Sequence, residues 1–388
     1  MRLAILASHP IQYQAPIFRQ LSKKCDLTVF FAHESTQTDQ SNAGFGVGFE
    51  WDVDLLSGYA YEFLENVSPQ PDLNHFSGCD TPSIGTTLAD GQYTILFVMG
   101  WHFKCFLQGV WAAKRLGLPV IVRGDSHLET PRSAAKRIAK RMAYPVALRS
   151  FDAALYVGAR SRCYWEHYRY PKERLFFSPH CVDNAWFAQR ATAEARQRLR
   201  DEHGIDREAK VVLFAGKLLP FKRPLDIITA ATVLALQRPN LTVLIAGSGE
   251  LGSTISTVAR EKGVHVAHLG FCNQSEMPAV YAAADALVLP SAGETWGLVA
   301  NEALACGRPI IVSSACGCAD DLAADGVAGR VFSMGDTNAL AATIDAVLAN
   351  PPSKEAINRK AANYSLDKAV EGIESALGAV SVWRKKGR

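Results

Sequence analysis

Several features are missing from the sequence, and each absence narrows the kinds of protein it can be. No run of 18 consecutive apolar residues is present, so we expect no membrane-spanning helix. The net charge is only +3, whereas nucleic-acid-binding domains are usually strongly basic. The nine cysteines form no Cys-x-x-Cys pair and there is no His-x-x-x-His, so we expect reduced thiols, an intracellular setting and no structural metal.

What is present indicates a folded protein of two domains. The chain has 388 residues, of which 48% are hydrophobic and 20% charged, as in ordinary globular proteins. This length allows two domains that each bury a core. The N-terminus superficially resembles a signal peptide, but its apolar part runs directly into Ser8, His9 and Pro10. We therefore expect a first buried strand there.

The first half of the chain alternates strand-like and helix-like stretches. Helices are expected near Pro16 to Lys24 and Phe103 to Leu116, between strands near Leu3–Ala7, Leu27–Phe31, Ile95–Met99, Val120–Arg123 and Ala153–Val157. This alternation is typical of a parallel sheet covered by helices, which binds ligands beyond the carboxyl ends of its strands. The second half repeats the pattern, with a strand at Val211–Ala215 and others at Leu241–Ala246 and His265–Phe271.

The segment from Gln37 to Thr87 interrupts this alternation and is too long for an ordinary connection. It is rich in glycine, aspartate and aromatic residues, namely Phe45, Phe49, Trp51, Tyr59, Tyr61 and Phe63. One interpretation is an insertion that shapes a substrate pocket, because aromatic faces and scattered polar groups suit sugars. The other is a surface loop packed by its own aromatic side chains.

The most informative stretch is Gly293 to Gly307, which follows an apolar run expected to be a buried strand. It is typical of a loop that leads into a short, mostly buried helix, and Gly307 with Pro309 ends that helix. If the helix opens near Gly297, its free amides and positive dipole end favour an anion such as a phosphate.

Two glutamates lie on either side of this helix start. Glu302 lies about 7 Å along the axis from the helix start, which is roughly the length of a nucleoside attached to a diphosphate bound there. Its carboxylate is expected to be buried and therefore needs a partner. Glu294, on the loop side, could meet a group attached beyond the phosphates. The spacing therefore predicts a nucleotide-sugar site. The alternative is one solvated and one fortuitously buried glutamate.

The block from Val280 to Gly307, with Glu294 and Glu302 separated by seven residues, closely resembles the retaining nucleotide-sugar glycosyltransferases of family 4. The resemblance is specific over about Val211 to Phe332 and looser before it. It implies an α/β protein with the GT-B fold, in which two Rossmann-like domains face each other across a cleft. It also implies that Glu302 binds the donor ribose, that Glu294 contacts the transferred sugar, and that the helix start at Gly297, Leu298 and Val299 takes the diphosphate.

Further donor residues follow from the same resemblance. After the strand Val211–Ala215, the family usually has an arginine and, five residues later, a lysine; here these are Lys217 and Lys222, next to Gly216. Cations at this place offset the charge that develops on a leaving diphosphate. Lys217 keeps the charge but lacks the bidentate fork of arginine. Gly247 is expected to let the backbone approach the donor. Phe271 and Cys272 are expected to lie beside the base of the nucleotide. Gly317 is also expected near the donor.

Candidates for the acceptor side lie in the first half. The loop after the first strand lacks the glycines that many family members have, and its polar residues His9 and Gln14 are our acceptor-binding candidates. The family also has a histidine near the transferred sugar, six residues after a conventional proline. Counting from Pro119 gives Asp125, and His127 lies two residues further on. Both remain candidates for that catalytic role beside Lys222 and Glu294.

Residues 132–149 contain six basic residues and no acidic one, at a spacing typical of a basic amphipathic helix. Such a helix could rest on an anionic membrane surface, or it could simply be a solvated face. The family's frequent use of lipid-linked acceptors keeps the first interpretation open. We accordingly expect a cytoplasmic protein, with peripheral association with the inner face of the plasma membrane as the further hypothesis.

The resemblance implies the following organisation and function. Residues 1–187 form an acceptor-binding domain, residues 188–364 a nucleotide-sugar-binding domain, and residues 365–388 a helix that returns to the first. The protein is expected to transfer a sugar, with retention and without a metal or cofactor, from a nucleotide sugar to a glycan or lipid-linked acceptor in surface polysaccharide or glycolipid synthesis. A uridine donor is preferred over guanosine. The alternatives are a nucleotide-sugar 2-epimerase and a catalytically weak scaffold subunit that binds nucleotide sugars.

Overall fold

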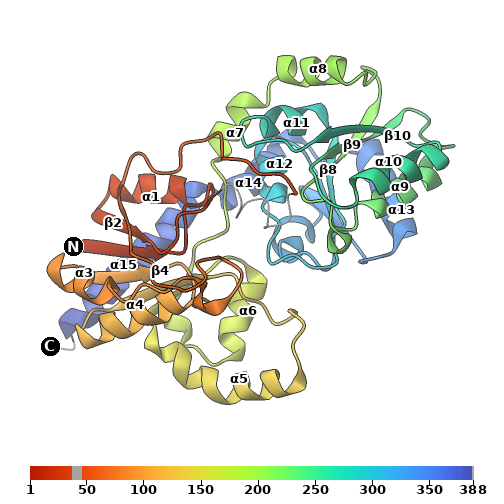
Figure 1. The fold of residues 1–388 in the computed structure, drawn as a ribbon. Helices are drawn as coiled ribbons and strands as arrows, with labels where there is room; N and C mark the ends of the chain where they lie inside the picture. Colours follow the sequence, from red (N-terminus) through yellow and green to blue (C-terminus); the bar gives the residue numbers. More distant parts are fainter. Residues whose placement is uncertain (37–45, 387–388) are drawn as a thin grey trace. The chain divides into compact units, whose positions relative to one another are not determined.

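The structure, a computed structural model, describes residues 1–36 and 46–386 and divides into two compact units. Of the described residues, unit 1 contains 1–36, 54–180 and 366–386, and unit 2 contains 46–53 and 181–365. Each unit has its own parallel sheet covered by helices, so the expected two-domain α/β fold is confirmed (Figure 1). The junction between residues 54–180 of unit 1 and 181–365 of unit 2 falls after His180, before the boundary expected after residue 187.

Among the described residues of unit 1, seven parallel strands form a sheet in the order β3-β2-β1-β4-β5-β6-β7. The strands are β1 (Arg2–Ala7), β2 (Asp26–Phe31), β3 (Ala60–Phe63), β4 (Ile95–Val98), β5 (Val120–Gly124), β6 (Ala153–Tyr156) and β7 (Leu175–Phe177). The central strands are apolar on both faces because helices cover both sides. In β4 every residue is buried.

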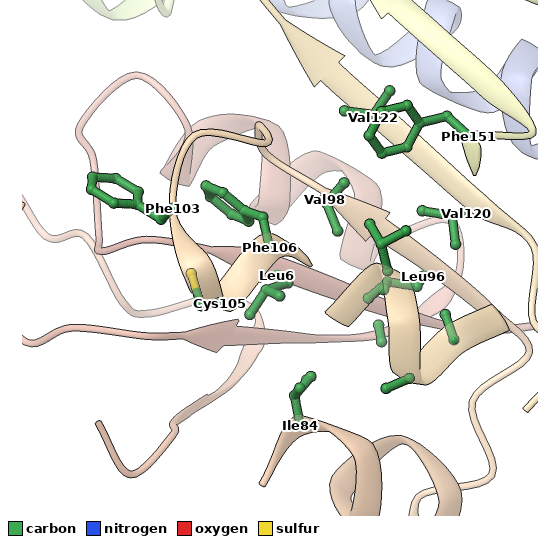
Figure 2. Close-up of a cluster of buried hydrophobic side chains, with 14 of the residues drawn as sticks. Leu6, Ile84, Leu96, Val98, Phe103, Cys105, Phe106, Val120, Val122 and Phe151 are labelled. Carbon is green, nitrogen blue, oxygen red and sulfur yellow. The ribbon is translucent and has the colours of Figure 1, made fainter. Parts of the chain in front are cut away.

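The helices of unit 1 bury the faces of this sheet. They are α1 (Ala15–Ser22), η2 (Phe76–Gly78), α3 (Ile84–Asp90), α4 (Lys104–Arg115), α5 (Ala134–Ala147), η3 (Leu148–Ser150), α6 (Ala159–His167), η4 (Lys172–Arg174) and α15 (Leu366–Lys386). Figure 2 shows part of the core, where side chains from β1, β4, β5 and the start of α4 meet, among them Leu6, Val98, Phe106 and Val122. The last helix, α15, packs against β6, β7 and α1 of this unit.

Unit 2 repeats the strand order of unit 1. Among its described residues, six parallel strands form a sheet in the order β10-β9-β8-β11-β12-β13. They are β8 (Lys210–Ala215), β9 (Leu241–Ala246), β10 (His265–Gly270), β11 (Ala286–Leu289), β12 (Ile310–Ser313) and β13 (Gly329–Phe332). Taken in chain order, this is the 3-2-1-4-5-6 arrangement of a Rossmann sheet.

The helices of unit 2 are α7 (Asn184–Arg190), α8 (Ala193–Glu202), η5 (Pro220–Lys222), α9 (Leu225–Leu234), α10 (Gly252–Glu261), α11 (Met277–Ala283), α12 (Val299–Ala305), η6 (Ala319–Ala323), α13 (Thr337–Ala349) and α14 (Lys354–Asn363). Residues of β8, β9, α9 and α13 pack into one buried cluster that fixes the strands whose ends carry the site.

The expected strands and helices lie within two residues of the observed ones, but the segment from 37 to 87 differs from its prediction. It contributes strand β3 to the sheet, and Tyr59, Tyr61 and Phe63 of this stretch pack on Phe18 and Phe31 of unit 1. These rings are therefore part of unit 1's own packing. Phe49 and Trp51 belong to unit 2, and Phe45 lies outside the described residues.

Candidate functional site

The carboxyl ends of β8, β9 and β10 meet at one edge of the unit 2 sheet. Gly216 and Gly247 follow β8 and β9 with φ of 145° and 150°, a region that favours glycine. A Cβ atom on Gly247 would lie 1.9 Å from the carbonyl oxygen of Gly216. The amide of Gly247 also donates to the carbonyl of Gly270 at 2.7 Å. The backbones of the three turns are thus in direct contact with one another.

The sequence analysis missed one signal at this edge. Gly247, Gly249 and Gly252 have the Gly-x-Gly-x-x-Gly spacing between a strand and a helix, the pattern of backbone turns that cradle phosphates. A Cβ atom on Gly249 would come within 2.8 Å of the Leu218 carbonyl. The second glycine is therefore required by the close approach of the two turns after β8 and β9.

Two lysines stand beside these turns. Lys217 directly follows Gly216, and burial lowers its pKa, as does the neighbouring charge of Lys222, against the opposing effect of Glu294. Lys222 ends η5, and its Nζ forms an ion pair with Oε1 of Glu294. The Ser291 hydroxyl donates to the same oxygen at 3.1 Å. The side chains of Lys222 and Glu294 are only 18% and 14% exposed, so this pair is held in a largely enclosed place.

The loop after β11 brings Glu294 to that position. Gly317 donates its amide to the carbonyl of Glu294 at 3.0 Å, and a Cβ atom on Gly317 would lie 1.9 Å from the Thr295 carbonyl. Gly297 has φ of 102°, and a Cβ atom there would lie 2.7 Å from Leu289. Both glycines are needed for this loop to pack against β11 and the turn after β12.

Helix α12 follows, with Leu298 as its N-cap and Val299 as its first residue. Glu302 is 2% exposed, and the hydroxyl of the buried Tyr281 donates a hydrogen bond to its Oε2. The buried carboxylate thus has a partner inside the protein, as its burial required. Tyr281 comes from α11 and was not foreseen, because no local pattern in the sequence connects it with Glu302.

A cavity lies wholly in unit 1, at the carboxyl ends of its strands. Its volume is about 300 Å³, at the lower end of the range for small-ligand pockets. Two of the predicted acceptor residues, His9 and Gln14, line it, together with Trp101, His102, Asp125 and His180. A Cβ atom on Gly124 would lie 2.3 Å from the Trp101 ring, so this glycine lets the indole form a wall of the cavity.

Asp125 extends from the end of β5 into this cavity, with a side chain that is 46% exposed. Its Oδ2 lies 3.5 Å from Nε2 of His180. Burial opposes ionisation of Asp125, but the neighbouring His180 and the charge of Arg123 outweigh it and hold the pKa of Asp125 below its usual range. Burial lowers the pKa of His180, an effect that Asp125 partly offsets. At neutral pH we therefore expect an ionised carboxylate beside a neutral imidazole.

Arg123 explains how His180 reaches Asp125 from far along the chain. The buried guanidinium of Arg123 donates to the carbonyls of Ser178 and Pro179, the latter at 2.7 Å. These bonds fix the segment before His180 against β5. His180 was not predicted, because no local pattern in the sequence connects it with Asp125.

The structure distinguishes between Asp125 and His127, the two candidates for the role of the family's histidine. Asp125 lines the cavity, whereas His127 is not among its lining residues. His127 instead lies near Glu129 and Thr130, with its Nε2 3.5 Å from the Thr130 hydroxyl. Burial lowers the pKa of His127, although Glu129 acts against this.

Helix α5 contains the predicted basic sequence and lies at the outer edge of unit 1 (Figure 1). It has no buried residue. Ile138, Met142 and Val146 recur at helical spacing and are 61%, 77% and 74% exposed. They are interspersed with Lys136, Arg137, Lys140 and Arg141. The helix therefore presents an apolar stripe with cations on both sides of it.

The predicted residues thus fall into two groups, one in each unit. In unit 2 the proposed donor residues lie in the turns after β8, β9, β10 and β11 and in α12, and in unit 1 His9, Gln14 and Asp125 line one cavity. Among the residues that the structure describes, no three metal-ligating side chains are gathered as a metal would need. In the same part of the chain, no helix is long and apolar enough to cross a membrane.

Two Rossmann-like units, one with glycine turns and lysines at its strand ends, define the GT-B class of fold. Residues 195–364, somewhat less than half of the chain, match the family model described as "Glycosyl transferases group 1". A D-inositol 3-phosphate glycosyltransferase of Mycolicibacterium gilvum is 35% identical over 208 residues, which cover 51% of this chain and 45% of that protein. The match therefore spans less than half the length of that relative.

Solved structures support the fold over the whole chain. The Anabaena protein Alr3699/HepE in complex with UDP has a TM-score of 0.73 at 17% identity, with 98% of this chain and all of that chain covered. WaaG, a glycosyltransferase involved in lipopolysaccharide biosynthesis, has a TM-score of 0.65 at 16% identity, with 98% and 99% covered. At these identities the likeness establishes the fold alone.

Proposed function

We propose that the protein is a retaining glycosyltransferase that moves a sugar from a nucleotide sugar to a hydroxyl acceptor. The observation that carries the proposal is the Lys222–Glu294 pair, enclosed beside the glycine turns after β8 and β9. A cation there can neutralise a diphosphate, and a carboxylate can hold sugar hydroxyls. The match of this region to the glycosyl transferases group 1 family supports the same assignment.

The donor is assigned to unit 2. The diphosphate lies against Lys217 and Lys222, with backbone amides of Gly216 and of the α12 start at Leu298 and Val299. Glu302, oriented by Tyr281, takes the ribose hydroxyls, and Phe271 lies beside the base. We favour uridine because the similar Anabaena protein was solved with UDP and with UDP-glucose.

The reaction breaks the bond between the anomeric carbon and the oxygen of the terminal phosphate. The acceptor oxygen forms its bond to the same face of that carbon, and its proton passes to the leaving phosphate oxygen. Lys217 and Lys222 stabilise the charge on the departing diphosphate. The proposed step needs no metal and no separate base, because the leaving phosphate accepts the proton. Glu294 holds the sugar while the bond breaks.

The acceptor is assigned to the cavity of unit 1. Its aromatic wall at Trp101 and its polar groups His9, Gln14 and Asp125 suit the apolar face and the hydroxyls of a sugar. Among the described residues, Oε1 of Gln14 is buried without a hydrogen-bond partner. A hydroxyl of the acceptor can supply that missing bond. Of the two candidates for the role of the family's histidine, we choose Asp125 over His127, because Asp125 lines this cavity and His127 does not.

The setting we propose is the assembly of a glycolipid or surface polysaccharide at the inner face of the membrane. The exposed apolar stripe of α5 with its adjacent cations supports contact with an anionic lipid surface. Such contact would bring the cavity of unit 1 to a lipid-linked acceptor.

The direct test is to incubate the purified protein with UDP-sugars and membrane lipid extract and to measure UDP release and labelled product. We expect a product whose anomeric configuration, determined by NMR, equals that of the donor. Inversion of configuration would refute the retaining mechanism. Release of UDP with conversion of the sugar to its 2-epimer, without any acceptor, would favour the epimerase alternative. Nucleotide binding without turnover would favour a scaffold subunit.

A further inference from the structure

A short arm of the N-terminal half belongs to unit 2. We call residues 46–53 the arm. The described residues before and after it, 1–36 and 54–180, lie in unit 1. The arm packs on the turn formed by residues 271–276, between β10 and α11. This turn begins directly after the strand end that contacts the glycine turn at Gly247. The arm thus contacts the turn after β10, which is separated in the sheet by β9 from β8, the strand that the two lysines follow.

The polar contacts between the arm and this turn are specific. Asp52 accepts hydrogen bonds from the Ser275 amide, at 3.1 and 3.2 Å to its two oxygens, and from the Ser275 hydroxyl. The Asn273 side chain donates to the Glu50 carbonyl at 2.7 Å and accepts from the Asp52 amide at 3.4 Å. The turn is therefore anchored at two positions by main-chain and side-chain groups of the arm.

The arm also contacts Phe271 through an aromatic ring. The ring of Phe49 lies 4.3 Å from the ring of Phe271, measured between centroids, and Trp51 meets Phe49 edge to face at 4.9 Å. Phe49 is 9% exposed, so its ring is enclosed by this packing. Gly270, immediately before Phe271, has φ of 74°. At this glycine the chain departs from the extended geometry of β10.

We propose that Asp52 is a positioning residue of the donor site. By anchoring Ser275 it fixes the turn 271–276, and with Phe49 it holds the Phe271 ring in place for the nucleotide base. A turn fixed before binding loses less conformational freedom when the nucleotide arrives, and affinity rises accordingly. This inference rests on the proposed function, because it requires a nucleotide in unit 2.

The experiment compares binding of UDP, GDP and inorganic pyrophosphate by calorimetry to the full-length wild type and the Asp52→Ala variant. We expect Asp52→Ala to weaken binding of the preferred nucleotide about fivefold, as for loss of a capping carboxylate. Pyrophosphate, which has no base, should bind both proteins equally. The variant should also raise KM for the nucleotide sugar with kcat little changed. Equal nucleotide affinity, or equal loss for nucleotide and pyrophosphate, would overturn the proposal.

Two further variants serve as controls. Asp52→Asn keeps a side-chain oxygen that can accept from Ser275 and should restore most of the affinity. Asp54→Ala removes a carboxylate two residues further on, which accepts from the amides of Leu56 and Ser57 in unit 1. It should bind nucleotide as the wild type does. Weakening by Asp54→Ala equal to that by Asp52→Ala would overturn the proposal.

Hydrogen exchange separates this inference from the proposed function. Without any ligand, the amides of Gln274 and Ser275 should exchange faster in Asp52→Ala than in the wild type. Unchanged exchange would overturn the anchoring role even if nucleotide binds. If the wild type binds none of the nucleotides, the assignment of unit 2 as a donor domain fails, and with it the role of Asp52 in that site.

Discussion

The two units share a strand order but differ in what stands at the carboxyl ends of their strands. In unit 2 these ends carry glycine turns in contact with one another and the enclosed Lys222–Glu294 pair. In unit 1 they carry imidazoles, an indole and Asp125 around a cavity of about 300 Å³. The strand ends of the two units therefore suit two different ligand chemistries. Exposed backbone and cations suit a diphosphate, and aromatic walls with hydrogen-bonding groups suit a sugar hydroxyl.

The largest effect should follow from removing the cation in unit 2. Lys222→Ala should lower kcat for sugar transfer about 1,000-fold, because the leaving diphosphate loses a charge that stabilises it. Lys210→Ala, at the exposed amino end of β8, is the matched control and should behave as the wild type. The measurement is release of UDP from the nucleotide sugar. If both variants are equally active, the phosphate site has been placed wrongly.

The contact between glycine turns in unit 2 should be sensitive to a single methyl group. Gly247→Ala adds a Cβ atom 1.9 Å from the Gly216 carbonyl at a φ of 150°. We expect a loss of about 3 kcal/mol in the free energy of unfolding from backbone strain and overpacking. Gly263→Ala, where φ is 66° and nothing lies within 4 Å, should lose about 1 kcal/mol. Urea denaturation measures both, and equal losses would contradict the close packing of the turns.

A change in unit 1 should affect transfer without affecting nucleotide binding. Asp125→Asn removes the charge that His180 and Arg123 stabilise, and we expect kcat/KM for the acceptor to fall about 30-fold. Affinity for UDP should stay unchanged, because the proposed donor residues lie in unit 2. His127→Ala should stay within about threefold of the wild type in both assays. A larger loss at His127 than at Asp125 would reverse our choice between these residues.

The smallest effect concerns the exposed stripe of α5. Met142→Glu places a charge where an apolar side chain is 77% exposed, and binding to phosphatidylglycerol vesicles should weaken about tenfold. Leu236→Glu, at a 98% exposed position in unit 2, provides the control and should bind as the wild type does. Vesicle sedimentation gives the partition coefficients. No binding by the wild type would leave α5 as a solvated helix.

Local patterns predicted much of this molecule, and tertiary contacts explain most of what they missed. The buried strands and the basic helix α5 follow from periodicity within short windows, whereas Gly216 and Gly247 were named from the family resemblance. Strand β3 was missed because three of its four residues, Ala60, Tyr61 and Glu62, are exposed and form no apolar run. His180 and Tyr281 reach their carboxylates through contacts between distant segments. The same holds for the arm, whose Asp52 meets Ser275 on an element more than 200 residues away.

The measurement that tests the central claim most directly is a thermal-shift screen of the wild type and Glu302→Ala against UDP, GDP, ADP and CMP. A ligand at 100 times its dissociation constant stabilises the folded state by about 2.7 kcal/mol, which is readily seen as a rise in Tm. We predict that UDP raises the Tm of the wild type and has little effect on the variant. Failure of all four nucleotides to shift the wild type would contradict a nucleotide-sugar site in unit 2.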